Sequence, residues 1–155
     1  MKNDVTVVAV DKYVSVDNVG FKIDKLVLAD GHECLWALQW HGQSGLLEFK
    51  DSSSISFEES EYDKNVLPYV AQWEAEKARR EAEFEAEWNK PENVEARARA
   101  RRNSLLKETD YLLMPDYPLT EELRAAWTAY RQALRDLPEQ EGWPTDVIWP
   151  EKPDS

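Results

Sequence analysis

The sequence predicts an α+β protein whose first part is rich in β-strands and whose remainder is helical. Of the 15 Val and Ile residues, 10 lie within residues 1–60, whereas 12 of the 15 alanines and all 8 prolines lie after residue 60. β-Branched residues favour strands and alanine favours helices. We therefore expect a small antiparallel β domain in residues 1–60, a long charged connecting helix in residues 61–90 and a C-terminal helical domain in residues 91–155.

The β domain is predicted to be a sheet of about five strands. Residues 5–10 read VTVVAV, which is typical of a buried strand, and residues 17–20 form a turn-rich stretch between two short apolar segments. The clearest hairpin follows, because apolar residues alternate from Cys34 to Trp40 before a turn at residues 41–45. In this interpretation Cys34 is a partly buried strand residue. Ile55 and Phe57 mark the last short strand.

The connecting helix is expected from Asn65 to Trp88. Its apolar stripe comprises Val66, Tyr69, Val70 and Trp73. Its charged middle offers three ion pairs at i,i+4 spacing, namely Glu76 with Arg80, Lys77 with Glu81, and Arg79 with Glu83. Trp73, Phe84 and Trp88 have no evident intramolecular cover, so self-association through this long helix is also predicted.

Two further helices are predicted to form a helical hairpin with an extended Trp/Pro tail. One begins at Pro91 and ends near Lys107, and the next has Thr120 as its N-cap. The apolar face of the latter comprises Leu123, Trp127, Tyr130 and Leu134. Prolines at 144, 150 and 153 keep the residues before them out of the helical region, so the tail is expected to be extended.

Composition and charge exclude several classes of partner. The formal charge is −12 and the pI is about 4.6. Such a surface disfavours nucleic acid and anionic membranes, and no apolar run approaches the roughly 20 residues that span a bilayer. The basic cluster of Arg97, Arg99, Arg101 and Arg102 is interpreted as a solvated helix face. One cysteine and an N-terminus unlike a signal peptide favour a reducing cytoplasm.

Catalytic chemistry finds little support in the sequence. His32 and His41 are the only histidines, and both lie in or beside turns of the β domain. No second pair of ligands is spaced to complete a tetrahedral metal site, and no phosphate-binding glycine loop or nucleophile motif occurs. We therefore expect no enzyme activity, no catalytic residues, no metal site and no cofactor.

Residues 102–150 carry the most distinctive pattern in the chain. Its blocks are RNSLLKETDY at 102–111, PDYPLT at 115–120, AWTAYRQALRD at 126–136, and the closing GWP and WP units. In this order the blocks resemble the C-terminal region of bacteriophage tail assembly chaperones, small proteins that assist the folding or attachment of tail fibres. The plan of a β-rich beginning and a helical end is also similar to that of tail fibre assembly proteins.

The resemblance implies a non-enzymatic chaperone in the host cytoplasm that binds a phage tail fibre protein and assists its folding, trimerisation or attachment. The alternative is a structural component of the virion tail, an adaptor or cap that stays on the fibre.

Eight residues of the C-terminal region are the candidates for partner binding, since Trp, Tyr and Arg are enriched in interface hot spots. They are Tyr111, Tyr117, Trp127, Tyr130, Arg131, Arg135, Trp143 and Trp149. Two alternatives stay open for most of them. Trp127 and Tyr130 fit the core of the hairpin better than a partner contact. Arg131 and Arg135 suit ion pairs with Asp110, Asp116 or Asp136 as well as with carboxylates of a partner. Trp143 and Trp149 suit a fold back onto the hairpin as well as a partner.

Overall fold

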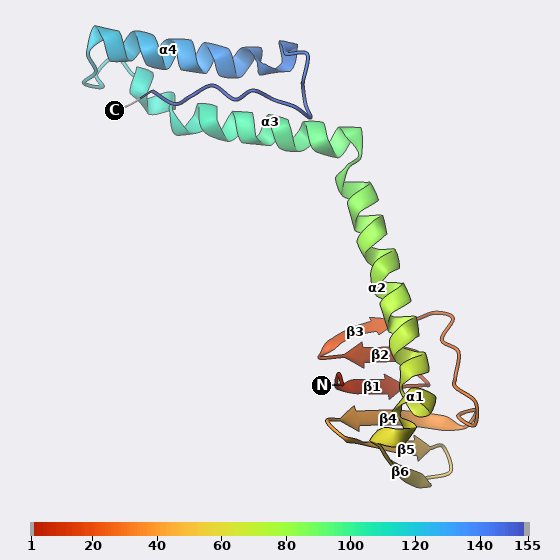
Figure 1. Cartoon of the computed structure of the whole chain (residues 1–155). Helices are drawn as coiled ribbons and strands as arrows, with labels where there is room; N and C mark the ends of the chain where they lie inside the picture. The colour runs from red at the N-terminus through yellow and green to blue at the C-terminus, as the bar shows by residue number, and fades with distance from the viewer. Residues whose placement is uncertain (1, 154–155) are drawn as a thin grey trace. The chain divides into compact units, whose positions relative to one another are not determined.

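The computed structural model describes residues 2–153, and its chain divides into two compact units, Met1–Glu83 and Phe84–Ser155. We call them the N-terminal unit and the C-terminal unit. The first contains an antiparallel sheet and the helix that covers it, and the second is helical (Figure 1). The predicted α+β class is confirmed.

Six strands form one antiparallel sheet in the N-terminal unit, one more than the five or so predicted. They are β1 (Val5–Val8), β2 (Tyr13–Val16), β3 (Val19–Lys22), β4 (Leu35–His41), β5 (Ser44–Phe49) and β6 (Ser54–Glu58), in the spatial order β3-β2-β1-β4-β5-β6. The turn between β2 and β3 needs only Asp17 and Asn18, both with positive φ, because Val16 already pairs with Val19. The third strand therefore begins two residues before the predicted Phe21.

An irregularity in β4 changes which residues face the core. The pairing with β5 shifts register between Leu35 and Ala37, and Leu35, Leu38 and Trp40 are all buried. Strict alternation would place Leu35 on the opposite face from Leu38, so the bulge returns Leu35 to the covered side. The predicted partial burial of Cys34 is wrong, because Cys34 precedes the strand and is exposed.

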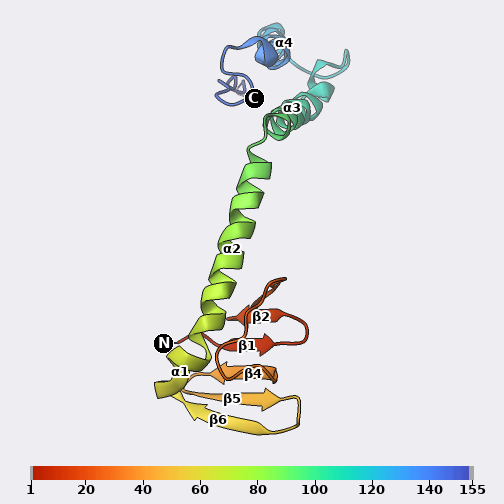
Figure 2. The same cartoon turned by 90° about the vertical axis from the view of Figure 1, so that its right-hand side faces the viewer.

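The covered face of the sheet packs against a helical segment. After the 3-10 turn η1 (Glu59–Glu61) and the single-turn helix α1 (Tyr62–Asn65), the long helix α2 spans Leu67–Trp88 (Figure 2). The predicted apolar stripe is confirmed, since Val66, Tyr69, Val70 and Trp73 are all buried with the strand valines in one core. Trp40 lies at its centre and stacks on Phe57 at 5.6 Å between ring centroids.

Trp73 is covered by the sheet, which corrects the expectation that it lacks intramolecular cover. Its indole N–H donates to the carbonyl of Val19 at 2.8 Å, and its ring stacks on Phe21 at 5.6 Å. Of the three aromatic residues on which self-association was predicted, only Phe84 and Trp88 remain exposed.

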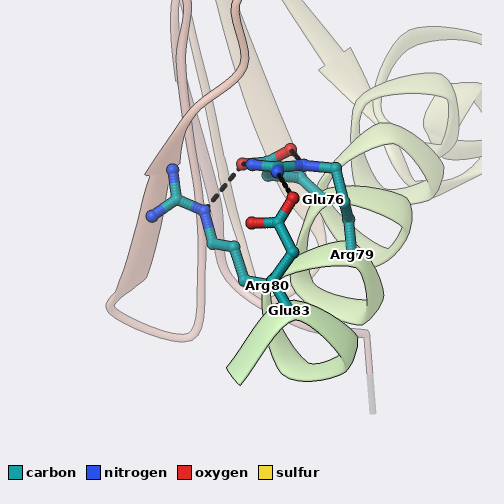
Figure 3. Close-up of polar contacts among 4 residues, drawn as sticks. All are labelled: Glu76, Arg79, Arg80 and Glu83. Atoms are coloured by element: carbon teal, nitrogen blue, oxygen red, sulfur yellow. Dashed lines mark hydrogen bonds and ion pairs between the residues drawn. The ribbon is translucent and has the colours of Figure 1, made fainter. Parts of the chain in front are cut away.

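The charged part of α2 contains several ion pairs, and all three predicted pairs form. Arg80 donates to Glu76 at 2.6 Å, Lys77 lies 3.9 Å from Glu81, and Arg79 pairs with Glu83. Arg79 also reaches Glu76 at 2.7 Å, so that one carboxylate accepts from two guanidinium groups (Figure 3). These hydrogen bonds lower the pKa of Glu76 to about 2. Ion pairs at these spacings stabilise the helix.

The C-terminal unit is built on two long helices. Helix α3 spans Pro91–Glu108 with Pro91 in its first turn, and α4 spans Glu121–Asp136. The predicted N-cap is confirmed, because the Thr120 hydroxyl accepts from the backbone N–H of Leu123 at 3.2 Å. Two 3-10 turns, η2 (Asp110–Leu113) and η3 (Leu137–Glu139), lie before and after α4.

Candidate partner-binding site

A small apolar core holds α3, η2 and α4 together. Its buried members are Leu112, Trp127, Tyr130, Leu134 and Leu137. Trp127 and Tyr130 are 4% and 6% exposed, and their rings meet edge to face at 5.7 Å. The interpretation of these two residues as hairpin core is confirmed.

Arg131 of α4 forms hydrogen bonds to the end of α3 and to the start of η2, the segment that connects the two helices. Its guanidinium donates to the carbonyl of Leu106 at 2.5 Å, to the Thr109 hydroxyl at 2.8 Å and to the Asp110 carboxylate at 2.6 Å. Arg131 is buried, so these charge-assisted bonds act with little competition from water. Of the open alternatives, the ion pair with Asp110 is the one that forms. Arg135 is exposed and joins no ion pair among residues 2–153.

A groove of about 570 Å³ lies beside η2 and the start of α4. Its aromatic and apolar wall comprises Tyr111, Leu112, Tyr117, Leu119, Leu123 and Trp127. The rings of Tyr111 and Tyr117 meet edge to face at 5.2 Å, and Tyr111 is 48% exposed. A concave surface with several aromatic side chains and few charges is typical of a binding site.

The position of the groove follows from local structure. Tyr111 is carried by η2, which Arg131 holds in place, and Tyr117 precedes the N-cap of α4. Arg124 of α4 donates to the carbonyl of Tyr117 at 3.1 Å, which ties the loop to the helix. The wall is therefore fixed by hydrogen bonds before any partner arrives, which lowers the entropic cost of binding.

The chain after η3 lies back along the helices (Figures 1 and 2). The Gln140 side chain donates to the carbonyl of Ile148 at 3.0 Å and accepts from its N–H at 3.1 Å. Trp143 and Trp149 are partly buried against the core, and the Arg101 guanidinium lies 4.3 Å from the centre of the Trp149 ring. Of the two alternatives left open by the sequence, the structure has the folded-back one.

The family comparison falls on this unit. Residues 95–154 match the family model of the phage tail assembly chaperone protein. The resemblance seen in the sequence motifs is thereby confirmed for this segment, and it supports a role in phage tail assembly. Neither the curated proteins nor the solved structures include a significant match.

The whole wall of the groove lies within the matched segment, whereas the sheet lies outside it. Of the eight candidates, the structure brings together Tyr111, Tyr117 and Trp127 in the wall of the groove. Arg131 does not line the groove but bonds to Asp110, the residue before Tyr111. Arg135, Trp143 and Trp149 do not border the groove.

Of the eleven described residues that line the groove, eight are not among the candidates, and Leu119, Leu123, Lys152 and Pro153 are four of these eight. Leu119 and Leu123 flank the N-cap and continue the apolar face of α4 toward its start, a spacing that is visible in the sequence. Lys152 and Pro153 come from the tail, and no periodicity links them to the helices. Their position depends on the return of the chain after η3.

The basic cluster of α3 is engaged in local contacts. Arg99 pairs with Glu95 at 2.6 Å, and Arg101 lies on Trp149. The Arg97 guanidinium lies 3.8 Å from the centre of the Trp88 ring and donates to the Trp88 carbonyl at 2.7 Å. Trp88 also stacks on Phe84, which is 65% exposed, so this aromatic pair forms a second accessible surface.

The histidines occupy structural positions. His32 is buried, with Nδ1 2.9 Å from the Tyr69 hydroxyl, and burial lowers the pKa of its imidazole. His41 is exposed, with Nδ1 3.5 Å from the Asp4 carboxylate. Among residues 2–153, no three potential ligands cluster to hold a metal ion, and no helix is both long and apolar enough to cross a membrane.

Proposed function

We propose that the chain is a non-enzymatic chaperone that binds a phage tail fibre protein in the host cytoplasm and assists its folding, trimerisation or attachment. The observation that carries the proposal is the aromatic groove of the C-terminal unit, because it lies within the segment that matches the tail assembly chaperone family. Tyr111, Tyr117 and the accessible edge of Trp127 provide the contact surface.

The proposed mechanism is temporary cover of an apolar segment. A fibre chain that has not yet trimerised exposes strand edges and apolar side chains that aggregate. Aromatic side chains in a groove bury such a segment without nucleotide hydrolysis, and competition from the partner strands of the mature trimer releases it. The formal charge of −12 keeps the complex soluble through repulsion between copies.

Co-expression with the tail fibre protein of the same phage tests the proposal. We expect the yield of soluble fibre trimer to fall at least several-fold when the chain is omitted. The yield should also fall, relative to that with the unmodified chain, when the chain carries both Tyr117→Ala and Leu119→Glu. Trp36→Ala is the matched control, because Trp36 is an exposed tryptophan of the sheet. Unchanged trimer yield without the chain would contradict the proposal.

Mass spectrometry of purified particles separates this function from the alternative of an adaptor or cap. A chaperone that dissociates is absent from the particle or far below the copy number of the fibre. Presence in a fixed ratio to the fibre would favour the structural component.

A further inference from the structure

The chain's own C-terminal tail borders the groove. Lys152 and Pro153 line it together with Tyr117, Leu119 and Trp127. The Lys152 ammonium is 5.9 Å from the centre of the Trp127 ring, at the outer limit of a cation–π contact. The groove is therefore already bordered by the end of a short segment of sequence WPEKP, residues 149–153.

This segment is weakly attached. The last backbone hydrogen bonds of the described chain are those between Ile148 and the Gln140 side chain. Beyond them the segment is held by side chains: Trp149 packs on the core and under Arg101, Lys152 lies near Trp127, and Pro153 borders the groove. Glu151 and Lys152 are exposed. Residues 151–153 have no backbone hydrogen bond within the described chain, so a better ligand displaces them readily, because a cation–π contact at the surface is weak.

The chemistry of the segment indicates what the groove accepts. Pro150 and Pro153 fix an extended backbone that loses little entropy on binding, and grooves lined by aromatic side chains are a recurrent site for extended proline-containing peptides. Among residues 2–153 and apart from the tail, the only charged residue that lines the groove is Glu108, an acid. A basic side chain in the ligand is therefore electrostatically matched to the groove, as Lys152 is.

We propose that the groove binds an extended, proline-containing segment with a lysine or arginine, and that residues 151–153 of the chain itself occupy its edge until such a segment displaces them. The inference rests on the proposed function, since the displacing segment belongs to the phage tail protein that is chaperoned. It adds the chemical class of the ligand and an intramolecular competitor.

A labelled synthetic peptide of sequence IWPEKP, which repeats residues 148–153, tests the inference by fluorescence anisotropy with the full chain. We expect saturable binding, and a peptide with Lys152→Glu or with both prolines changed to Gly should bind about fivefold or more weakly. The chain variant Lys152→Glu has a weakened competitor, so it should bind the original peptide about two- to fivefold more tightly than the unmodified chain.

The site of binding is tested with chain variants. Tyr117→Ala and, separately, Leu119→Glu should weaken peptide binding at least tenfold, whereas Trp36→Ala and Phe84→Ala should leave it unchanged. Near-ultraviolet circular dichroism checks that each variant is folded. Failure of the peptide to bind, binding that ignores its lysine and prolines, or binding that survives both groove variants would each overturn the inference.

The two proposals fail separately. If the peptide binds in the groove but fibre yield in co-expression does not depend on the chain, the groove specificity holds and the chaperone function is wrong. If fibre yield depends on the chain but the peptide does not bind, the chaperone function holds and the ligand class is wrong.

Discussion

The two units differ in where their accessible aromatic side chains gather. In the N-terminal unit, Trp40 is fully buried between Phe57 and Tyr62. In the C-terminal unit, Tyr111, Tyr117 and Trp149 keep accessible surface. Tyr117 and Trp149 are partly buried against the core. The six-stranded sheet and its covering helix enclose the rings of one core, and Trp36 of β4 is left as an isolated exposed ring. The core of the C-terminal unit encloses Trp127 and Tyr130, whereas Tyr111 and Tyr117 keep accessible surface in the wall of the groove.

The arginines differ in the same sense. Arg79 and Arg80 of α2 pair with carboxylates along an exposed helix face, where water competes for each bond. Arg131 of α4 is buried and donates to two oxygens besides its carboxylate partner. The first arrangement supports a helix, whereas the second sets the position of the η2 turn. The difference predicts how strongly each region responds to substitution.

The largest effect is expected for Trp40→Ala, which removes the centre of the sheet core. Removal of a fully buried tryptophan lowers the free energy of unfolding by about 3–5 kcal/mol. Urea denaturation followed by circular dichroism measures it, and amide spectra should show loss of the sheet signals before those of α4. The control Trp36→Ala, on the same strand but 49% exposed, should change the free energy by about 0.5 kcal/mol or less.

Arg131→Ala is expected to have the next largest effect, because it removes the bonds to Leu106, Thr109 and Asp110. Hydrogen bonds of a charged group contribute about 1.5–3 kcal/mol each, and their losses are not additive, so a decrease of about 3 kcal/mol in the stability of the C-terminal unit is expected. Arg135→Ala, one turn later on the exposed face, should change it by less than about 0.5 kcal/mol. Equal effects of the two substitutions would contradict the assigned role of Arg131.

Thr120→Ala should destabilise α4 by about 1 kcal/mol through loss of the N-cap bond to Leu123. Thr128→Ala lies inside the same helix and is the matched control. Since alanine has the higher helix propensity, this second change is expected to be neutral or stabilising by a few tenths of a kcal/mol. Thermal denaturation of both variants gives the sign of each change.

The smallest effect is a pH dependence that belongs to α2. The pKa of Glu76 is about 2 in the folded chain and lies near 4.5 without its arginine partners. Its contribution to stability is therefore fully present above pH 4.5 and is lost as the pH falls toward 2. The difference in melting temperature between the unmodified chain and Glu76→Gln should shrink across that interval. A difference that stays constant from pH 6 to pH 3 would contradict the pairing.

The sequence predicts the elements that depend on local pattern. Alternation and β-branched residues locate the strands, the stripe from Val66 to Trp73 locates the covering helix, and Thr120 marks the start of α4. It does not predict the bulge at Leu35. The bulge arises from a shift in the pairing of β4 with β5, and nothing in the composition of the strand marks it. Cys34 was misplaced for the same reason.

The candidate site is predicted only in part. Tyr111, Tyr117 and Trp127 follow from an aromatic-rich segment, but their arrangement around one groove depends on how Arg131 holds the η2 turn. Lys152 lies 25 residues after Trp127 and reaches the groove along the chain beyond η3, which has no helix or strand. A contact of that kind has no periodic signature, so only the folded chain shows it.

Hydrogen–deuterium exchange of the full chain, alone and with the phage tail fibre protein, tests the central claim most directly, because it locates the bound surface on one of the two units. We predict slower exchange in residues 109–127 on binding, faster exchange or no change in residues 149–153 as the tail is displaced, and no change in strands β4 to β6. Protection confined to the sheet, with residues 109–127 unaffected, would contradict the claim that the groove of the C-terminal unit binds the partner.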